Sequence, residues 1–494
     1  MPQERETELK LEVDQPDQLA ISKALGLGEP RATRLSATYY DTPKAALGRA
    51  GISFRLRRSP DGCIQTINLA RSDAAGLFDR DEWERTLAGD APDLSAVDDA
   101  GLGEALGDTA AWQKIRPAFV VEVERRVWRT VTGDGDGDIE IVFDEGEVSA
   151  DGQHDRLCEI ELELKQAPAD ALFGLARSLA EAVPVRIGVL TKAERGYRLL
   201  SGEAGKATPA GAMQLTADAT IADAFAVVVE ACLHHFRLNE PLVAERDAAA
   251  LHQARVALRR LRSALSLFRD VVADPSFDAL REGLKRVANV LSEARNLDVL
   301  IERIAEAGNS AAPLDALRRE REAAYAHAVE ELASERTRRL MIDVLEWSVI
   351  GHWCQGSLSR AVHPMGPIAD FAAQVLDRQR RRVKKRGRGL IGLDAEPRHE
   401  VRIEAKKLRY AAEFFGSLFQ EEKQRRRRKS FVTALEAVQE HLGALNDLAT
   451  AEELAHGLAA RGIDLPQRRV DEGELLRQAD AAYDRLVDAK PFWR

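Results

Sequence analysis

Charged side chains alternate with apolar ones at the start of this chain. In the stretch ETELKLEV, residues 6–13, Glu6, Glu8 and Lys10 occupy every second position. Residues two apart share one face of a β-strand, so two carboxylates and an ammonium would point the same way. On a sheet that faces water they would form a solvated face, where an isolated ion pair contributes about 0–1 kcal/mol. Inside a closed barrel they would form a binding surface.

Three further stretches carry the same alternation. CEIELELK (158–165) places three glutamates on one face, FRLRR (54–58) does so with two arginines, and RDEWE (80–84) mixes both signs. A barrel lumen can hold both signs because each charge offsets the desolvation of the other. Carboxylate oxygens bind hard divalent cations, and guanidinium groups bind phosphate in a bidentate manner. The pattern therefore favours a lumen that holds divalent cations and a phosphate chain.

Basic side chains form a second pattern in the other half. HQARVALRRLRSALSLF (252–268) matches HEVRIEAKKLRYAAEFF (399–415) at an offset of 147 residues. At helical spacing each copy has an apolar stripe and, beside it, a basic stripe. The basic stripes are His252, Arg255, Arg259 and Arg262, and His399, Arg402, Lys406 and Arg409. A single stripe is typical of a solvated face, but two in register favour an anion site. Few aromatic residues interleave with them, so we expect bare phosphate rather than nucleic acid as the ligand.

The elements that must position these residues differ between the two halves. Up to about residue 200 the period is two, with turns rich in Gly, Pro and Asp and one clear helical stretch at 169–183. The segment 201–212, SGEAGKATPAGA, has the composition of a linker. Beyond it the period is helical. We predict a β-rich domain at 1–200 and an all-α domain at 213–494 built from two pseudo-symmetric helical bundles.

Bulk composition limits the function further. With 494 residues, a net charge of −10 and a pI near 5.7, the chain holds several domains and is not a general nucleic-acid binder. Its four cysteines are widely scattered, which argues against a zinc or disulfide framework and suits a reducing compartment. The N-terminus has no signal-like apolar core, and the run 224–233 is too short to span a bilayer. We expect a cytoplasmic protein without a membrane partner, in an oligomeric state that the sequence leaves open.

The motifs of the first half resemble those of CYTH domains, the triphosphate tunnel metalloenzymes. ETELK at 6–10 is similar to that family's ExExK signature, and YYDT (39–42), FRLRR, FDEG (143–146), CEIELELK and TKAERGY (191–197) follow in the family's order. The resemblance implies a closed antiparallel β-tunnel that acts on triphosphates with Mg²⁺ or Mn²⁺. It implies metal ligands at Glu6, Glu8, Asp144, Glu159 and Glu161, and phosphate-binding groups at Lys10, Arg55, Arg57, Arg125 and Lys192. Catalysis would depend on Glu6, Glu8 and Lys10.

One position departs from the family. Where a Lys usually follows a Thr in the strand after the arginine pair, this chain has Asn68. An amide can hydrogen-bond to phosphate but supplies no charge. We therefore expect a change in substrate affinity or in the preferred chain length.

The helical repeats resemble the CHAD domain, a histidine-containing helical module that binds inorganic polyphosphate. The match includes RNLDVL (295–300), which adds Arg295 to the phosphate-binding set, and LNDL (445–448). A CYTH domain followed by CHAD resembles bacterial inorganic triphosphatases, so we expect metal-dependent hydrolysis of inorganic triphosphate. Two alternatives remain: a polyphosphate sensor or scaffold without turnover, and a tunnel enzyme that acts on an organic triphosphate, as thiamine triphosphatases and class IV adenylate cyclases do.

Overall fold

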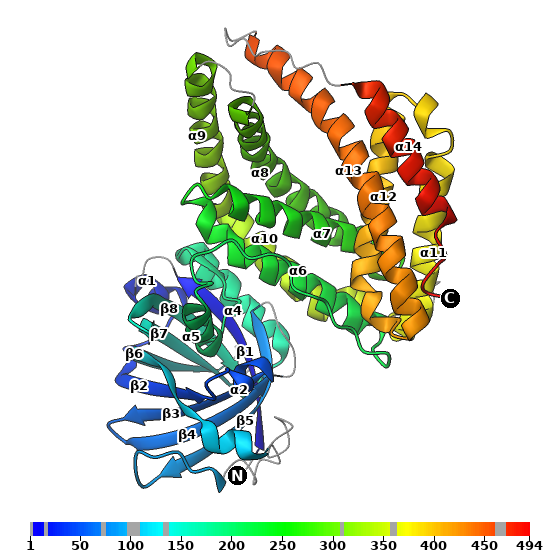
Figure 1. Cartoon of the computed structure of the whole chain (residues 1–494). Coiled ribbons are helices and arrows are strands. Elements are labelled where there is room, and N and C mark those ends of the chain that lie inside the picture. The colour runs from blue at the N-terminus through cyan, green and yellow to red at the C-terminus, as the bar shows by residue number, and fades with distance from the viewer. Residues whose placement is uncertain are drawn as a thin grey trace. The chain divides into compact units, whose positions relative to one another are not determined.

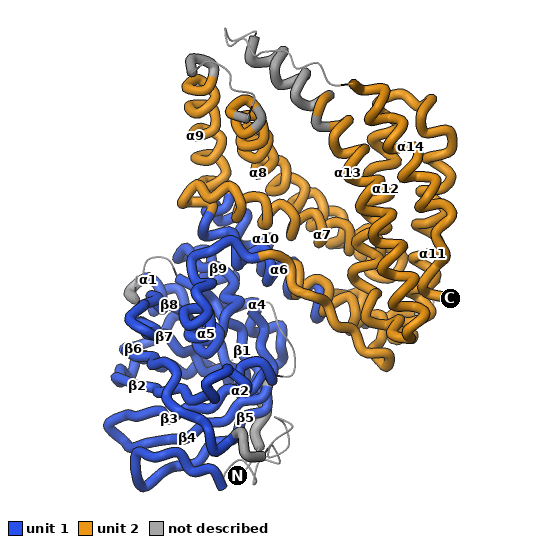
Figure 2. Tube along the Cα trace, in the orientation of Figure 1, with its two compact units in different colours: residues 1–208, 233–242, 332–350 blue, residues 209–232, 243–331, 351–494 orange. Residues whose placement is uncertain are grey.

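A computed structural model describes residues 3–13, 18–70, 76–95, 109–131, 138–306, 311–355, 363–459 and 471–494 (Figure 1). The chain divides into two compact units (Figure 2). The first comprises residues 1–208, 233–242 and 332–350, and the second comprises 209–232, 243–331 and 351–494. Two segments from the helical half therefore pack with the β-rich unit.

The strands of the first unit close into a barrel. Its eight strands are β1 (Gln3–Val13), β2 (Arg31–Asp41), β3 (Ile52–Ser59), β4 (Gly62–Ala70), β5 (Leu77–Leu87), β6 (Arg116–Val131), β7 (Asp138–Ala150) and β8 (Gln153–Leu164). They pair antiparallel in the order β5-β4-β3-β2-β6-β7-β8-β1, and β1 pairs with β5 to complete the circle. A short strand, β9 (Val185–Ile187), continues along the end of β1. The prediction of a closed antiparallel β-tunnel followed by an all-α domain is confirmed.

The register of the barrel fixes which face each charge occupies. Lys10 lies opposite Glu161 and Glu8 opposite Glu163 in the β1–β8 pair. A slip of one residue would exchange the charged and apolar faces of the whole strand. The alternating apolar residues Leu9 and Leu11 are also buried, because helix α4 (Ala169–Ala182) packs against β1 and β8. Both faces of β1 are thus withdrawn from water, and the charged face is the inner one.

Helix α5 (Lys192–Ser201) is held against the barrel by the residues of two of the motifs. Thr191 begins it with a capping box, in which its hydroxyl accepts from the amide of Glu194 at 3.1 Å and the Glu194 carboxylate accepts in return. Tyr197 donates to Asp41 at 2.7 Å, and the same carboxylate accepts from the backbone of helix α2 (Ala46–Arg49). The short helix α1 (Gln18–Ala24) is the remaining helix of the described part of the barrel region.

The long helices follow in chain order. They are α6 (Ile221–Val243), α7 (Ala248–Val272), α8 (Phe277–Glu306), α9 (Ala311–Ala333), α10 (Glu335–Ile350), α11 (Ile368–Arg386), α12 (Ala395–Phe414), α13 (Glu422–Ala459) and α14 (Glu472–Asp488). The two repeated segments form α7 and α12, which pack on each other in the second unit. The apolar stripe of each copy is buried throughout, and Phe268 and Phe415 contact each other at 5.7 Å between ring centroids. Within the described residues no helix is long and apolar enough to cross a membrane.

Glycine 146 in the FDEG motif provides a test of the barrel packing. A Cβ at this position would lie 1.9 Å from the backbone oxygen of Glu122 on β6, so Gly146→Ala should force the two strands apart and cost about 1–3 kcal/mol of unfolding free energy. Gly174→Ala on α4, where no atom lies within 4 Å of the new Cβ, should instead stabilise by about 1 kcal/mol. Urea unfolding of both variants measures this. Equal stability of the two variants would contradict the strand packing.

Candidate active site

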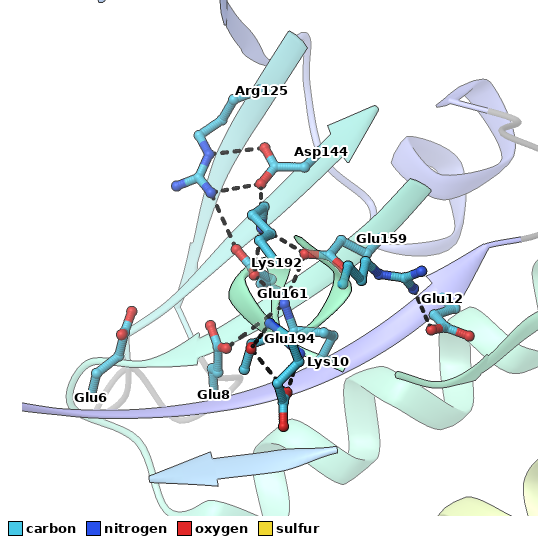
Figure 3. Close-up of polar contacts among 12 residues, drawn as sticks. Glu6, Glu8, Lys10, Glu12, Arg125, Asp144, Glu159, Glu161, Lys192 and Glu194 are labelled. Carbon is cyan, nitrogen blue, oxygen red and sulfur yellow. Dashed lines mark hydrogen bonds and ion pairs between the residues drawn. The ribbon is translucent and has the colours of Figure 1, made fainter. Parts of the chain in front are cut away.

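A cavity of about 370 Å³ lies inside the barrel. Its walls include many of the predicted residues, namely Glu6, Lys10, Arg55, Arg57, Arg125, Glu161 and Lys192. Glu8, Asp144 and Glu159 are fully buried in the same wall. Figure 3 shows how the acidic and basic side chains of β1, β6, β7, β8 and α5 meet at this point. The structure therefore brings together all ten tunnel residues that the sequence suggested.

One group of charges is closely paired. The Lys10 Nζ atom donates to Glu159 at 2.7 Å and to Glu161 at 2.6 Å. The Lys192 Nζ atom donates to the same two carboxylates at 2.6 and 2.8 Å and lies 2.9 Å from Asp144. Arg125 makes a bidentate contact with Asp144 at 2.9 and 2.6 Å. Burial alone would raise the pKa of Glu161, but the adjacent cations hold that pKa well below its ordinary value.

A second group of charges is paired less completely. Arg80 donates to Glu6 at 2.7 Å and its Nη2 atom lies 3.1 Å from Glu8. Glu8 is 0% exposed, yet neither of its oxygens has a hydrogen-bond partner within the described residues. Burial, with added repulsion from Glu161 and Glu6, raises the pKa of Glu8 to about 8. A buried carboxylate with open acceptor sites is costly unless a cation meets it.

These carboxylates fit a divalent cation. Glu6, Glu8 and Glu163 form one group whose oxygens lie within 4.8 Å of one another, and Asp144, Glu159 and Glu161 form another. Lys10, Lys192 and Arg125 offset the three carboxylates of the second group, whereas the first group has three carboxyl groups for two cations, Arg80 and Lys165. Both oxygens of Glu8 in the first group are open acceptors, and in the second group one oxygen of Glu159 is open. An all-oxygen donor set selects hard ions such as Mg²⁺ or Mn²⁺ over zinc.

The arginine pair of β3 lines a further part of the cavity. Arg55 lies 3.7 Å from Glu82, and Arg57 lies 3.2 Å from Glu84. Asn68 is opposite Glu82 in the β4–β5 register and also lines the cavity. Burial, together with the nearby Glu6, raises the pKa of Glu82 to about 7. Asn68, the residue that departs from the family pattern, is thus part of the cavity wall.

The residues predicted from the sequence did not include every charged residue of the cavity wall, and Arg80 and Glu163 are the two omissions closest to the ETELK motif. Arg80 contacts both carboxylates of the ETELK motif, and Glu163 shares their oxygen cluster. The signal for both was present, because the alternation in RDEWE and CEIELELK places them on the charged faces. The predicted set kept only the residues that the family resemblance implied, which left these two out.

Backbone contacts hold β1 at the level of Lys10. The Lys10 amide donates to Gly76 at 2.8 Å, and the Gly188 amide donates to the Lys10 carbonyl at 2.8 Å. Two residues on, Glu12 accepts from Arg237 at 2.7 Å, a residue of the α6 segment that belongs to this unit. The same guanidinium donates to the carbonyl of Ile187 at 2.8 Å. The strand that carries the ETELK motif is therefore fixed from both sides.

In the second unit the basic stripes bring several cations together. Burial and the charges of Arg259, Arg295 and Arg402 lower the pKa of Arg255 to about 10. His252 is surrounded in the same way: burial, then Arg295, Arg259 and Arg255, lower its pKa to about 4. We call these five residues the basic cluster. Because α7, α8 and α12 all contribute, it is a convergent site rather than one helix face.

The other stripe residues have different neighbours. Arg262 lies near Glu282 and Arg281, Arg409 lies 3.4 Å from Glu413, and the exposed His399 contacts Asn446 at 2.5 Å. Lys406 is half-buried one turn after Arg402 on α12. Arg259 of the basic cluster donates to Tyr410 at 2.8 Å.

Comparisons with known proteins divide the chain in the same way. The CYTH domain model matches residues 4–197, and the CHAD domain model matches residues 227–456. An inorganic triphosphatase of Haemophilus influenzae is 25% identical over 193 residues, which cover 37% of this chain and 53% of that protein. The chain thus matches about half the length of that relative.

Two solved structures are also similar. The CHAD domain of the plant Ricinus communis is 30% identical, with a TM-score of 0.48, over 58% of this chain and 98% of that one. The putative adenylyl cyclase HpAC1 from Hippeastrum, described as having a dominant triphosphatase activity, is 19% identical over 40% of this chain and 96% of that one, with a TM-score of 0.32.

The family models match the same ranges that carry the tunnel and the helical repeats. The chain consists of a CYTH domain at residues 4–197 followed by a CHAD domain at residues 227–456.

Proposed function

We propose that the tunnel hydrolyses inorganic triphosphate to diphosphate and phosphate with Mg²⁺ or Mn²⁺, and that the helical half binds inorganic polyphosphate. The observation that supports hydrolysis is the meeting of open carboxylate acceptors with Lys10, Lys192 and the arginines in one cavity of the barrel. The related inorganic triphosphatase supports the same substrate class. The free cysteines among the described residues suit our further proposal of a cytoplasmic location.

The cavity wall favours an inorganic substrate over one with an organic base. The aromatic residues that line it already have partners: Tyr39 stacks on Phe119 with ring centroids 4.7 Å apart, Tyr197 donates to Asp41, and Phe78 lies under the Lys10 ammonium. Tyr39 and Phe78 are also buried, so the cavity wall has little aromatic surface for stacking on a base. Cations, in contrast, extend from the arginine pair of β3 to Lys192, which suits a chain of phosphates.

The chain's own residues have separable roles in this reaction. Arg55 and Arg57 would hold one end of the phosphate chain, and Lys10, Lys192 and Arg125 would donate to the oxygens that gain charge as water attacks the terminal phosphorus in line. Glu6, Glu8 and Glu163, with the Asp144 group beside them, would hold the metal. When bound, a divalent ion supplies positive charge that polarises the phosphoryl oxygens and lowers the pKa of water.

Polyphosphate binding is supported by the basic cluster. Burial and the surrounding guanidinium groups lower the pKa values of Arg255 and His252, and Asp298 opposes the change only at Arg255. That repulsion destabilises the free protein and would be relieved by a polyanion. A sensor or scaffold without turnover would have the same basic cluster. Only a measurement of phosphate release by the tunnel distinguishes such a protein from an enzyme.

The first test concerns the open carboxylate. Glu8→Gln should reduce phosphate release from triphosphate at least 100-fold, because it removes a metal-binding charge from the centre of the cavity. Glu147→Gln changes a half-exposed glutamate of β7 and should leave turnover unchanged. Phosphate release is measured with triphosphate, ATP, thiamine triphosphate and long polyphosphate, with Mg²⁺ or with EDTA. Full turnover in EDTA, or an active Glu8→Gln protein with Mg²⁺, would refute the proposal.

The second test concerns position 68. Asn68→Lys adds a cation to the cavity wall and should lower the KM for triphosphate several-fold, up to about tenfold, since Glu82 takes up part of the added charge. Asn68→Met provides a chain of similar length without the charge and should not lower the KM. If both variants behave alike, charge at this position does not contribute to binding.

The third test concerns the basic cluster in the full-length Glu8→Gln background. Replacing Arg255, Arg259, Arg402 and Lys406 by Ala should weaken long-chain polyphosphate binding by at least tenfold. Replacing the exposed Lys423, Arg425, Arg426 and Lys429 of α13 should have a much smaller effect. Binding should also weaken steeply with salt as counterions are released. Equal losses in the two variants would indicate diffuse attraction.

The pKa of His252 gives an independent readout of the same binding. Its value of about 4 in the free protein should rise when a polyanion offsets the neighbouring guanidinium charges. Binding would then take up a proton, so affinity should increase as the pH falls through the bound-state pKa towards 4. Histidine NMR titration with and without polyphosphate measures both pKa values. An unchanged His252 pKa would place the ligand elsewhere.

A further inference from the structure

A second cavity, of about 550 Å³, lies within the helical unit. Its walls come from α7, α12, α13 and the irregular segment at residues 210–214. It has a different charge environment from the tunnel and is not part of the basic cluster. Tyr410 stands between the two sites, because it lines this cavity and its hydroxyl accepts from Arg259 of the cluster.

Arg260 is the unusual residue of this cavity. It is only 4% exposed, and its Nε atom has no hydrogen-bond partner among the described residues. The carboxylate of Glu413 lies 4.0 Å from that atom, beyond hydrogen-bond distance, and the guanidinium carbon lies 5.7 Å from the Phe414 ring. The guanidinium of Arg260 thus has a buried N–H group without an acceptor, which is costly. It points to an anion that completes its contacts.

Two further arginines line the same cavity, and the pKa of its acidic residue, Glu413, is raised. Arg409 and Arg428 add positive charge, and the acidic side chain that faces them within the lining is Glu413. Burial and the nearby Glu436 raise the pKa of Glu413, although Arg409 and Arg260 oppose the rise. Even with Glu436 counted beside Glu413, the three guanidinium groups leave an excess of positive charge that matches an anionic phosphate group, which arginine binds in bidentate fashion.

The remaining walls are partly apolar and suit a ligand that has an organic part as well as a charged group. Met213, Val256, Ala412 and Val432 supply apolar surface. The segment 210–214 is fixed beside the cavity because the Leu215 amide donates to the Ser417 hydroxyl at 2.8 Å. The volume exceeds the need of a single phosphate and falls in the range of about 300–1,000 Å³ typical of small-molecule sites.

We propose that this cavity, which we call the Arg260 pocket, binds a phosphate group through Arg260, Arg409 and Arg428. The group is carried either by free orthophosphate or diphosphate or by a small phosphate monoester whose organic part lies against the apolar wall. The site is distinct from the tunnel and from the basic cluster, and it does not depend on the proposed hydrolysis.

Methionine methyl NMR on the full-length protein tests the proposal at the site itself. The chain has four methionines, of which Met213 lines the pocket and Met341 lies buried on α10. In protein labelled with ¹³C-methyl methionine, Met213→Leu identifies the Met213 signal. Titration uses orthophosphate, diphosphate, glycerol 3-phosphate and AMP. We expect a saturable shift of the Met213 signal and no shift of the Met341 signal.

Variants that change a charge in the pocket distinguish binding at this site from effects of phosphate on the protein as a whole. Arg260→Gln should weaken the Met213 response at least tenfold, and Arg428→Gln should weaken it in the same direction if Arg260→Gln fails to fold. Arg318→Gln, an exposed change on α9, should not alter it. Glu413→Gln should strengthen binding, because it removes the competing carboxylate, whereas a purely structural role for Glu413 would predict weaker binding.

The pattern of responses decides the ligand source. A response to orthophosphate or diphosphate supports an inorganic ligand, and a response only to glycerol 3-phosphate or AMP supports a monoester. No saturable Met213 shift with any of the four probes would overturn the proposal. An unchanged response in Arg260→Gln and Arg428→Gln would also overturn it.

Discussion

The tunnel depends on charge balance in a place from which water is largely removed. Lys10 is 1% exposed and is surrounded by carboxylates, so its strand could not fold into the barrel unless acids arrived from β8. The reverse holds for Glu161, whose carboxylate is held by three cations from β1, β6 and α5. No strand of the wall carries a compensated set alone. Charge pairing therefore ties the register of each strand to the register of its neighbours.

In the helical half, charges of the same sign lie together instead of being paired with opposite charges. Its basic cluster gathers Arg255, Arg259, Arg295, Arg402 and His252, and their mutual repulsion lowers pKa values instead of raising them. This repulsion destabilises the fold, and burial of the apolar stripes on α7 and α12 offsets the destabilisation. Under the proposed function, the paired charges of the lumen would serve a reaction that needs a metal. The cation-rich cluster would serve a long polyanion that brings its own charge.

Alternation predicted the barrel strands and the residues that share a face, because residues two apart in a strand point the same way. It left open whether the charged faces meet water or a lumen, and the mixture of signs and the family resemblance favoured the lumen. It did not predict α5, since TKAERGY is short and its role depends on partners such as Asp41 that lie far away in the sequence. The basic stripes were predicted as continuous, but ten residues extend about 15 Å along a helix. Arg262 therefore meets Glu282 and Arg281 instead of the cluster. We also did not predict that residues 233–242 and 332–350 pack with the barrel unit. The apolar face of a helix shows that the helix packs against something, but not against which element.

That interleaving has a consequence for the order of synthesis. Arg177 on α4 of the barrel unit contacts Asp343 at 3.0 Å and also Glu346, both on α10, and Glu12 contacts Arg237. All strands of the barrel leave the ribosome well before these two helical segments. A nascent barrel would therefore have its α4 surface uncovered, and the Glu12 carboxylate would have Arg195 but not Arg237 as a partner. The last contacts of the first unit are made only after residues 243–331, part of the second unit, have been synthesised.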